Sequence, residues 1–322
     1  NMVDHNKLKV CLISAYSTVP PYGILSLAAV LEQHGINVKI LDFARKGVEE
    51  QEILDGIADS DIIGLSAWSF LMINEAARIT RIIRKSLKER KFLMWGGVHS
   101  TLFPREVIEE FDLDAVCAGE GEFTLLELVN TLSSGGDITK VKGLWVKKNG
   151  GILFTGQRQD SIEVSALPGY AWHLIDASKY IINIKLTSMN EITLVESRGC
   201  PYQCTFCYAP KMFGLKWRGR TVDQVIEEIK FLKKKYHLHR FDLLDDLPFG
   251  GDRKKMLDFC SKIKALGVQW SCDQRINLID EELLRAMKES GIWYIYFGVE
   301  SGSPRMLEKI RKKQSGEVDW MP

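Results

Sequence analysis

The chain has 322 residues, a length that suits two domains of about 150 residues better than one. It is 45% hydrophobic and 26% charged, so it can bury a sizeable core and is not a disordered chain. Because 43 Lys and Arg residues face 42 Asp and Glu residues, the net charge of +1 argues against a broad nucleic-acid-binding surface.

Sequence features of membrane and secreted proteins are missing. The richest apolar stretch, residues 62–73, is interrupted by glycine and serine and is too short to span a bilayer. The N-terminus has no apolar signal-peptide core. Seven cysteines, an odd number in a long chain, do not indicate a disulfide scaffold. We therefore expect a soluble, cytoplasmic protein with no membrane or nucleic-acid partner.

Residues 7–134 alternate apolar runs with segments of helical period. The expected strands are residues 8–14, 38–41, 61–66, 92–95 and 115–118. Gly35 stands where a glycine ends the first helix. Near-continuous apolar strands indicate a parallel sheet covered by helices on both faces. Right-handed crossovers make this a doubly wound, flavodoxin-like (Rossmann-type) α/β domain.

Ligands of such sheets bind at the carboxyl ends of the strands. The candidate contact residues at those ends are Tyr22, Gly23, Ser66, Trp68, Gly96, Gly97, Gly119, Glu120 and Gly121. Glycines there let a large planar ligand approach the backbone, although the same glycines also suit tight turns that bind nothing. No G-x-G-x-x-G opens the first helix, which disfavours a dinucleotide.

Residues 135–190 are expected to form a hairpin and a connector. Two short apolar runs, 143–146 and 152–155, flank Asn149-Gly150, which is a strong hairpin signal. The remainder, with Pro168-Gly169 and no sustained period, is interpreted as an ordered connector packed on both halves.

Residues 191–322 repeat a β–α pattern four times. The expected strands are 192–196, 241–244, 270–272 and 294–299, and the helix starts include Thr221 with Gln224 as a capping box, Asp280, and Ser303-Pro304. Polar residues where each strand ends are typical of a β/α barrel with its active site at those ends. The segment has about half the length of a full barrel. We expect a barrel truncated after about four units, because the tail 312–322 looks unlike a fifth strand. The last expected strand, 294–299, would then form an open edge of the sheet, and exposed edges invite self-association.

Three cysteines within eight residues, Cys200, Cys204 and Cys207, are the most informative feature of the sequence. A structural zinc site needs four ligands and a ferredoxin-type 4Fe–4S run brings four cysteines. Three cysteines on one loop instead leave one iron open to a substrate or cofactor. The alternatives are three unrelated thiols, or zinc completed by a distant ligand such as His237 or His239.

The segment CPYQCTFC resembles the cluster motif of the radical S-adenosylmethionine (SAM) enzymes, with Phe206 just before the last cysteine. The segments PPYGILSLAAVLEQHG, DIIGLSAWS, WGGVHSTLFP and AGEGE resemble the cobalamin-binding domain of the cobalamin-dependent branch of that superfamily. The segments SRGCPYQCTFCY, LLDDLPF, WSCDQRINLID and YFGVESGS resemble the first four units of its barrel. The resemblance covers most of the chain.

The resemblance implies that Cys200, Cys204 and Cys207 hold a 4Fe–4S cluster whose open iron chelates SAM. One electron passed into the sulfonium would give a 5′-deoxyadenosyl radical that abstracts hydrogen from a substrate. The SAM contacts it implies are Phe206 and Tyr208 near adenine, Asp245 and Asp246 at the amino group, Arg275 at the carboxylate, and Glu300 and Ser301 at the ribose. Each polar residue also has a reading as a strand-end cap or surface charge.

The resemblance also implies cobalamin over the strand ends of the first domain, touching Tyr22, Trp68, Gly97 and Gly121. Relatives that place histidine on cobalt carry D-x-H-x-x-G after the first strand, where this chain has residues 16–21, YSTVPP. We expect a surface or capping role for His99 and cobalamin without a histidine on its lower face.

The leading functional hypothesis is a cobalamin-dependent radical SAM methyltransferase acting on an unactivated carbon. A second uses the same cofactors for a cyclisation, rearrangement or oxidation without methylation. A third is a cobalamin-binding module with an incomplete, inactive barrel. Both enzymatic hypotheses need an external electron donor such as flavodoxin or ferredoxin and an organic substrate that the sequence does not identify.

Overall fold

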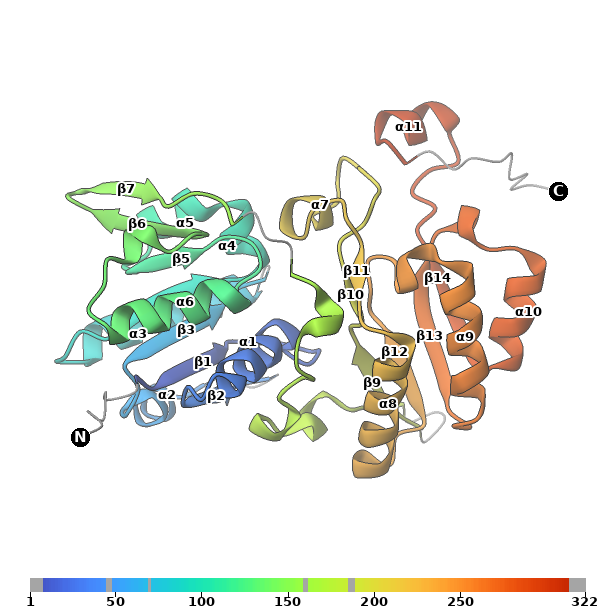
Figure 1. The fold of residues 1–322 in the computed structure, drawn as a ribbon, viewed down its shortest axis with the longest axis horizontal. Helices are drawn as coiled ribbons and strands as arrows, with labels where there is room; N and C mark the ends of the chain where they lie inside the picture. Colours follow the sequence, from blue (N-terminus) through green and yellow to red (C-terminus); the bar gives the residue numbers. More distant parts are fainter. Residues whose placement is uncertain (1–7, 45–47, 69–70, 159–161, 185–188, 313–322) are drawn as a thin grey trace. The chain divides into compact units, whose positions relative to one another are not determined.

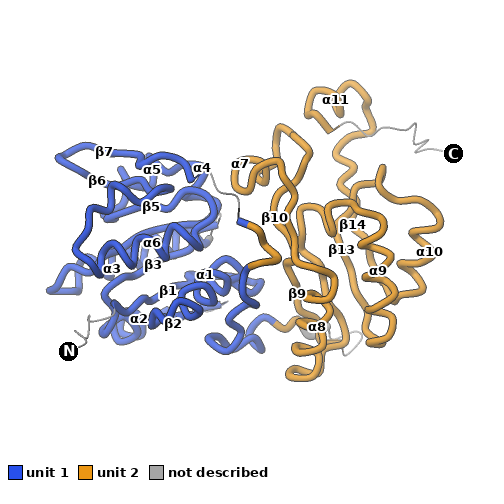
Figure 2. The backbone as a smooth tube through the Cα atoms, viewed as in Figure 1, with its two compact units in different colours: residues 1–162, 167–180 blue, residues 163–166, 181–322 orange. Residues whose placement is uncertain are grey.

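The computed structural model describes residues 8–44, 48–68, 71–158, 162–184 and 189–312 (Figure 1). The chain divides into two compact units, residues 1–162 with 167–180 and residues 163–166 with 181–322 (Figure 2). The expectation that the tail forms no strand concerns residues 313–322, which lie outside the described residues. Residues 69 and 70, after the third expected strand, also lie outside them.

The first unit is built on a seven-stranded sheet in the order β2-β1-β3-β4-β5-β6-β7. Its parallel strands are β1 (Val10–Ser14), β2 (Val38–Asp42), β3 (Ile62–Ser66), β4 (Phe92–Gly96) and β5 (Ala115–Cys117). The order 2-1-3-4-5 confirms the doubly wound, flavodoxin-like fold. The predicted hairpin is also confirmed, since β6 (Leu144–Lys148) and β7 (Gly151–Phe154) pair antiparallel and β6 extends the same sheet beside β5.

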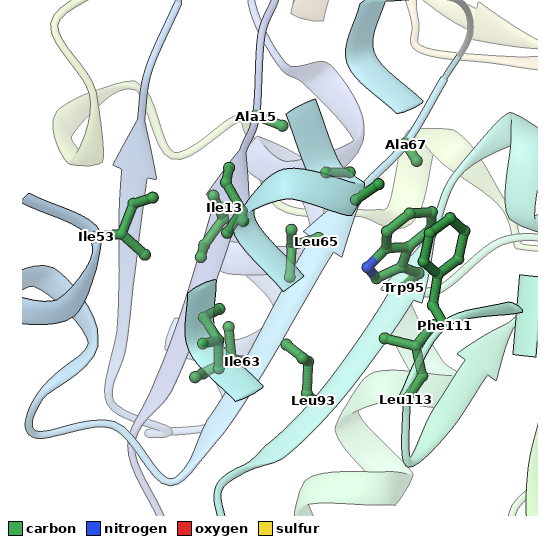
Figure 3. Close-up of a cluster of buried hydrophobic side chains, with 14 of the residues drawn as sticks. Ile13, Ala15, Ile53, Ile63, Leu65, Ala67, Leu93, Trp95, Phe111 and Leu113 are labelled. Carbon is green, nitrogen blue, oxygen red and sulfur yellow. The ribbon is translucent and has the colours of Figure 1, made fainter. Parts of the chain in front are cut away.

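Helices cover both faces of this sheet, as the apolar strands predict. They are α1 (Tyr22–Gln33), α2 (Glu50–Ile57), α3 (Leu71–Ser86), α4 (Val98–Leu102), α5 (Pro104–Glu110) and α6 (Glu122–Ser133). On one face Ile13, Leu65 and Trp95 belong to a buried cluster with residues of α2, α3 and α5 (Figure 3). On the other face Leu12 and Met94 pack with residues of α1 and α6. Alternate residues of each strand therefore enter different cores.

The connector contributes to the core of the first unit. The Tyr180 side chain is 1% exposed and its hydroxyl donates to the Asp42 carboxylate at the end of β2. The Lys179 ammonium donates to the Asp42 carbonyl at 3.0 Å. Short 3-10 turns, which sequence periodicity did not reveal, run through this part of the chain at Ile138–Lys140, Val164–Ala166, Trp172–Leu174 and Ala177–Tyr180.

The second unit contains a five-stranded sheet in the order β14-β13-β12-β9-β8. Its four parallel strands confirm the four predicted β/α units: β9 (Met189–Leu194), β12 (Arg240–Leu243), β13 (Gln269–Gln274) and β14 (Ile292–Phe297). An antiparallel strand that the sequence did not predict, β8 (Ile182–Ile184), pairs with β9. Within the described residues β14 pairs with β13 alone, so it forms one edge.

The described helices of the second unit are α7 (Ala209–Met212), α8 (Val222–Tyr236), α9 (Arg253–Lys264), α10 (Glu281–Glu289) and α11 (Pro304–Lys309). The predicted caps stand before α8, α10 and α11, whereas no cap was predicted for α7 and α9. The Thr221 and Gln224 capping box forms in both directions, and the Leu283 amide donates to Asp280 at 2.7 Å. Ser303 occupies the N-cap of α11 with Pro304 at the first helical position, but its side chain makes no capping hydrogen bond.

No helix within the described ranges combines the length and apolarity needed to cross a bilayer.

Candidate functional site

The three cysteines lie on one loop of the second unit, between the two-residue strand β10 (Ser197–Arg198) and α7. The Cys207 amide donates to the Cys204 carbonyl at 3.1 Å, which turns the loop back on itself. Cys200 and Cys207 pack in one small apolar cluster with Ala209 and Leu247. Burial raises the pKa of both of these thiols. The fold therefore brings Cys200 and Cys207 into one cluster, and Cys204 lies on the same loop between them in the chain.

Gly199 fixes the start of the cysteine loop. Its φ is +86°, and a Cβ there would lie 2.4 Å from the Lys216 carbonyl oxygen. That carbonyl precedes β11 (Arg218–Gly219), the antiparallel partner of β10. Only glycine fits this approach, so the backbone immediately before Cys200 is held by the β10–β11 pair.

Asp245 and Asp246, predicted together as SAM contacts, have different surroundings. The Asp245 carboxylate is buried at the end of β12 and accepts the backbone amides of Glu196 (3.1 Å) and Ser197 (2.8 Å). Its hydrogen bonds therefore join the end of β12 to the chain that leads into the cysteine loop. Burial raises the pKa of Asp245 to about 7. Asp246 accepts a hydrogen bond from the Tyr208 hydroxyl, which follows the last cysteine.

Glu196 lies beneath the same loop, and sequence analysis assigned it no role. Its side chain is almost fully buried, and its Oε1 accepts the Phe249 amide at 2.6 Å. Its Oε2 is buried without a hydrogen-bond partner. Burial, reinforced by the nearby Asp245, raises the pKa of Glu196 well above its usual range. The only sequence signal that could have pointed to Glu196 is its place as an acidic residue directly after the run 192–195.

Arg275 reaches the cysteine loop from the end of β13. Its guanidinium carbon lies 3.6 Å from the centre of the Tyr202 ring, and its Nη1 lies 3.8 Å from the Cys204 sulfur. The residue is 9% exposed, so this positive charge lies in a largely desolvated position beside a predicted thiolate.

The predicted ribose contacts lie after β14. The Glu300 carboxylate accepts a hydrogen bond from the Lys312 ammonium at 2.6 Å, and Ser301 Oγ accepts the Ser303 amide at 3.1 Å. The Phe206 ring is 57% exposed, and the Lys312 ammonium lies 5.8 Å from its centre. Lys312 was not among the predicted site residues.

The strand ends of the first unit lie in register. Ser66 at the end of β3 is the direct neighbour of Gly96 at the end of β4. Gly97 has φ +94°, and a Cβ there would lie 2.9 Å from the Ala67 carbonyl oxygen, so a side chain would clash. The Gly119 amide donates to Thr101 Oγ1 at 2.9 Å, which ties the loop after β5 to the end of α4.

The other candidate cobalamin contacts differ in exposure. Tyr22 is buried, with its ring edge-on to Tyr170 at 5.0 Å and to Trp172 at 5.8 Å. Trp68 is 38% exposed, and Glu120 is half-buried. Glu122, which sequence analysis did not single out, is buried at the start of α6 and accepts the Ser26 hydroxyl at 2.7 Å.

Comparison with known families gives two matches that together cover most of the chain. Residues 8–129 match the B12 binding domain, and residues 194–318 match the Radical SAM superfamily. The chain therefore combines a B12 binding domain with a domain of the Radical SAM superfamily. This confirms the resemblance that the cysteine motif and the strand-end segments predicted.

Three curated relatives of this radical SAM protein align along nearly all of it. An uncharacterized methyltransferase of Pyrococcus horikoshii is 35% identical over 92% of the chain and 64% of its own length. The cytidylyl-2-hydroxyethylphosphonate methyltransferase of Streptomyces wedmorensis is 28% identical over 91% of the chain and 63% of its own length. The anaerobic magnesium-protoporphyrin IX monomethyl ester cyclase of Rubrivivax gelatinosus is 29% identical over 92% and 55%, respectively. The chain thus spans less than two thirds of each of these relatives.

Two solved structures share the fold. The cobalamin-dependent SAM radical enzyme OxsB, with aqua-cobalamin and SAM bound, superposes with a TM-score of 0.79 at 21% identity, over 96% of this chain and 46% of that one. The radical SAM methyltransferase TsrM from Kitasatospora setae, with cobalamin and a [4Fe-4S] cluster bound, gives 0.77 at 18% identity, over 97% and 62%.

The cysteine loop of this radical SAM protein offers three thiols, the ligand type that iron–sulfur clusters use. In the part of the chain that the structure describes, no three His, Cys, Asp or Glu side chains converge as the ligands of one ion would. The thiolates around a cubane bind separate irons and need not converge in this way. The proposed zinc ligand His239 precedes β12, and its Nδ1 accepts the Asn190 amide at 3.4 Å. It therefore lies at the amino end of the sheet, whereas the cysteine loop lies at the carboxyl end.

Proposed function

We propose that the protein is a cobalamin-dependent radical SAM enzyme that methylates an unactivated carbon. The observation that carries this proposal is the cysteine loop with Arg275 at 3.8 Å from the Cys204 sulfur, in a chain whose relatives include named methyltransferases. A loop of three thiols with one guanidinium beside it suits a cluster that keeps one corner for a charged cofactor.

The residue roles follow the positions of the strand ends. Cys200, Cys204 and Cys207 would hold the cluster, which, when bound, supplies one electron to the sulfonium of SAM. Asp246 accepts from Tyr208 and would receive the amino group of SAM. Arg275 has the geometry to pair with its carboxylate, a contact that guanidinium makes well.

The remaining SAM contacts are proposed for the adenosyl group. Phe206 presents an exposed ring for adenine, and Tyr208 lies next to the last cysteine. Glu300 and Ser301, after β14, would bind the ribose hydroxyls. We propose that Asp245 acts indirectly, because its oxygens already accept the amides of Glu196 and Ser197.

Cobalamin would lie over the strand ends of the first unit, near Gly23, Trp68, Gly97 and Gly121. Position 97 must be glycine because its φ is +94° and a Cβ would clash with the Ala67 carbonyl oxygen. The backbone at the end of β4 therefore carries no side chain at this position. The His99 ring packs against Phe103 at 5.4 Å, and burial lowers its pKa. We propose that His99 is a packing residue and that no histidine binds the lower face of the corrin.

A second candidate function uses the same cofactors without methylation. It is favoured by the similarity to the anaerobic magnesium-protoporphyrin IX monomethyl ester cyclase of Rubrivivax gelatinosus. The third candidate, a cobalamin-binding module with an inactive barrel, requires that the second unit hold no working cluster.

Radical SAM enzymes need an external electron and an organic substrate. We propose flavodoxin or ferredoxin as the electron donor. We propose the edge strand β14 as the surface for self-association. Sedimentation of the protein at rising concentration tests this proposal, and a single monomeric species at all concentrations would reject it.

Labelled SAM separates the candidates. The reconstituted protein with cobalamin and a strong reductant should convert SAM labelled in its methyl group into S-adenosylhomocysteine, with the label recovered in the corrinoid fraction. A non-methylating enzyme would release 5′-deoxyadenosine but no S-adenosylhomocysteine. A binding module would produce neither, and that result would contradict the proposed function.

A further inference from the structure

Lys312 is a buried cation at the site for which the proposed function gives no role. The residue is 7% exposed, and its ammonium donates to Glu300 Oε1 at 2.6 Å. A buried ammonium is costly unless a charged partner compensates it. The Lys312 side chain is 9% exposed and the Glu300 side chain 34%, so the ammonium end of the pair is largely desolvated, unlike a pair between two exposed side chains, which would contribute little.

The backbone around this pair is held in an unusual conformation. Glu300 and Arg311 both have φ in the left-handed region, at +59° and +54°. Residues other than glycine adopt this region rarely, and they keep it where surrounding contacts over-determine them. The Lys312 amide donates to the Leu307 carbonyl at 2.9 Å, which closes the turn after α11 and aims the side chain back toward Glu300.

The same turn is joined to the cysteine loop. The Thr205 amide, between the second and third cysteines, donates to the Ile310 carbonyl at 3.0 Å. The Lys312 ammonium also lies 5.8 Å from the centre of the Phe206 ring, within the range of a cation–π contact. Lys312 thus contacts one residue proposed for the ribose and one proposed for adenine.

Space for the ammonium is provided by Gly298. A Cβ at this position would lie 2.5 Å from the Lys312 ammonium and 2.9 Å from Glu300 Oε1. The end of β14 is therefore shaped around the ion pair.

We propose that Lys312 is a positioning residue for SAM. It holds the Glu300 carboxylate in place and fixes its distance from the Phe206 ring, so the ribose and adenine contacts are preorganised before the cofactor arrives. This inference rests on the proposed function and adds to it a residue, outside the cysteine motif and the strand ends, that acts on SAM affinity through Glu300.

Equilibrium dialysis with radiolabelled SAM tests the inference on the anaerobically reconstituted protein. Lys312→Met removes the charge and keeps most of the stem, and it should raise the Kd for SAM about tenfold. Lys312→Arg restores the charge and should stay within about threefold of the original Kd. The exposed Lys309, one turn earlier on α11, supplies the control Lys309→Met, which should leave the Kd unchanged. Iron content should be equal in all four proteins.

A double-mutant cycle distinguishes positioning through Glu300 from a general structural effect. In the Glu300→Gln background, Lys312→Met should add little to the loss, because its partner charge is gone. The inference would be overturned if the two substitutions weakened SAM binding independently, so that their effects on the Kd multiplied in the double variant. It would also be overturned by an unchanged Kd in Lys312→Met, or by a loss of iron with unchanged SAM affinity per cluster. If the original protein carries a full cluster but binds no SAM, the proposed function itself fails.

Discussion

The guanidinium of Arg275 lies 3.8 Å from the sulfur of Cys204, although 70 residues separate them in the chain. Arg275 directly follows β13, whereas Cys204 is in the middle of the loop after β10, and stacking on the Tyr202 ring holds the guanidinium in place. A fixed positive charge beside a thiolate favours electron-rich states of whatever metal centre that thiolate binds.

Replacing Arg275 with leucine should therefore lower the midpoint potential of the bound cluster, by an amount on the order of tens of millivolts. An electron-paramagnetic-resonance redox titration measures it. Arg285→Leu is the matched control, because Arg285 is 73% exposed on α10 and pairs only with the neighbouring Glu281 in the described structure. An unchanged potential in Arg275→Leu would show that the guanidinium does not act on the cluster.

Glu196 should make the stability of the second unit depend on pH. Burial raises its folded-state pKa above the unfolded value, so its contribution is fully present below the unfolded pKa and is lost as the pH rises through the folded pKa. The free energy of unfolding should therefore fall with rising pH, and Asp245, with a pKa of about 7, should add to the fall. Glu196→Gln keeps the size and stays neutral, so it should flatten this dependence.

Urea unfolding between about pH 5 and about pH 9 gives the slopes. Glu227→Gln, on the exposed face of α8, should keep the original slope. If Glu196→Gln also keeps the original slope of unfolding free energy against pH, the Glu196 carboxyl does not titrate as inferred.

Tyr180 should contribute to the stability of the first unit. Tyr180→Phe removes the hydroxyl that donates to Asp42, whose side chain is 4% exposed, and a hydrogen bond to a charged buried group contributes about 1.5–3 kcal/mol. The first-unit transition in urea should shift by this amount. Tyr236→Phe, at the end of α8 in the second unit, should not shift the first-unit transition. An equal shift in both variants would refute the role of the Asp42 contact.

Gly23 offers a test of where cobalamin lies. It is in the first turn of α1, and a Cβ there would have no atom within 4 Å, so Gly23→Ala should stabilise the protein without cobalamin by about 0.5–1 kcal/mol. If the corrin approaches this backbone, the same methyl group should weaken cobalamin binding, measured by spectrophotometric titration. Stabilisation together with unchanged cobalamin affinity would exclude Gly23 from the contact surface.

Periodicity and caps predicted much of the fold from the sequence. The apolar runs gave the parallel strands of both sheets, and Asn149-Gly150 gave the hairpin, because each depends on neighbours in the chain. The strand β8 was missed because its three residues have no pattern of their own and are held by pairing with β9. The helix α2 was also not predicted.

The cysteine spacing singled out the loop, and the family resemblance implied roles for Arg275 and Glu300 that stay predictions. The roles of Glu196 and Lys312 depend on burial and on partners 53 and 12 residues away, which no local pattern indicates. The different surroundings of Asp245 and Asp246 likewise arise from hydrogen bonds between strands.

The most direct test of the account is SAM cleavage by the anaerobically reconstituted protein, measured with its iron content. We expect about four irons per chain and 5′-deoxyadenosine when dithionite and SAM are added. Both should be lost in Cys204→Ala and kept in Cys260→Ala, whose sulfur is buried on α9. Zinc or no metal in the original protein, or a complete cluster that never yields 5′-deoxyadenosine, would contradict it.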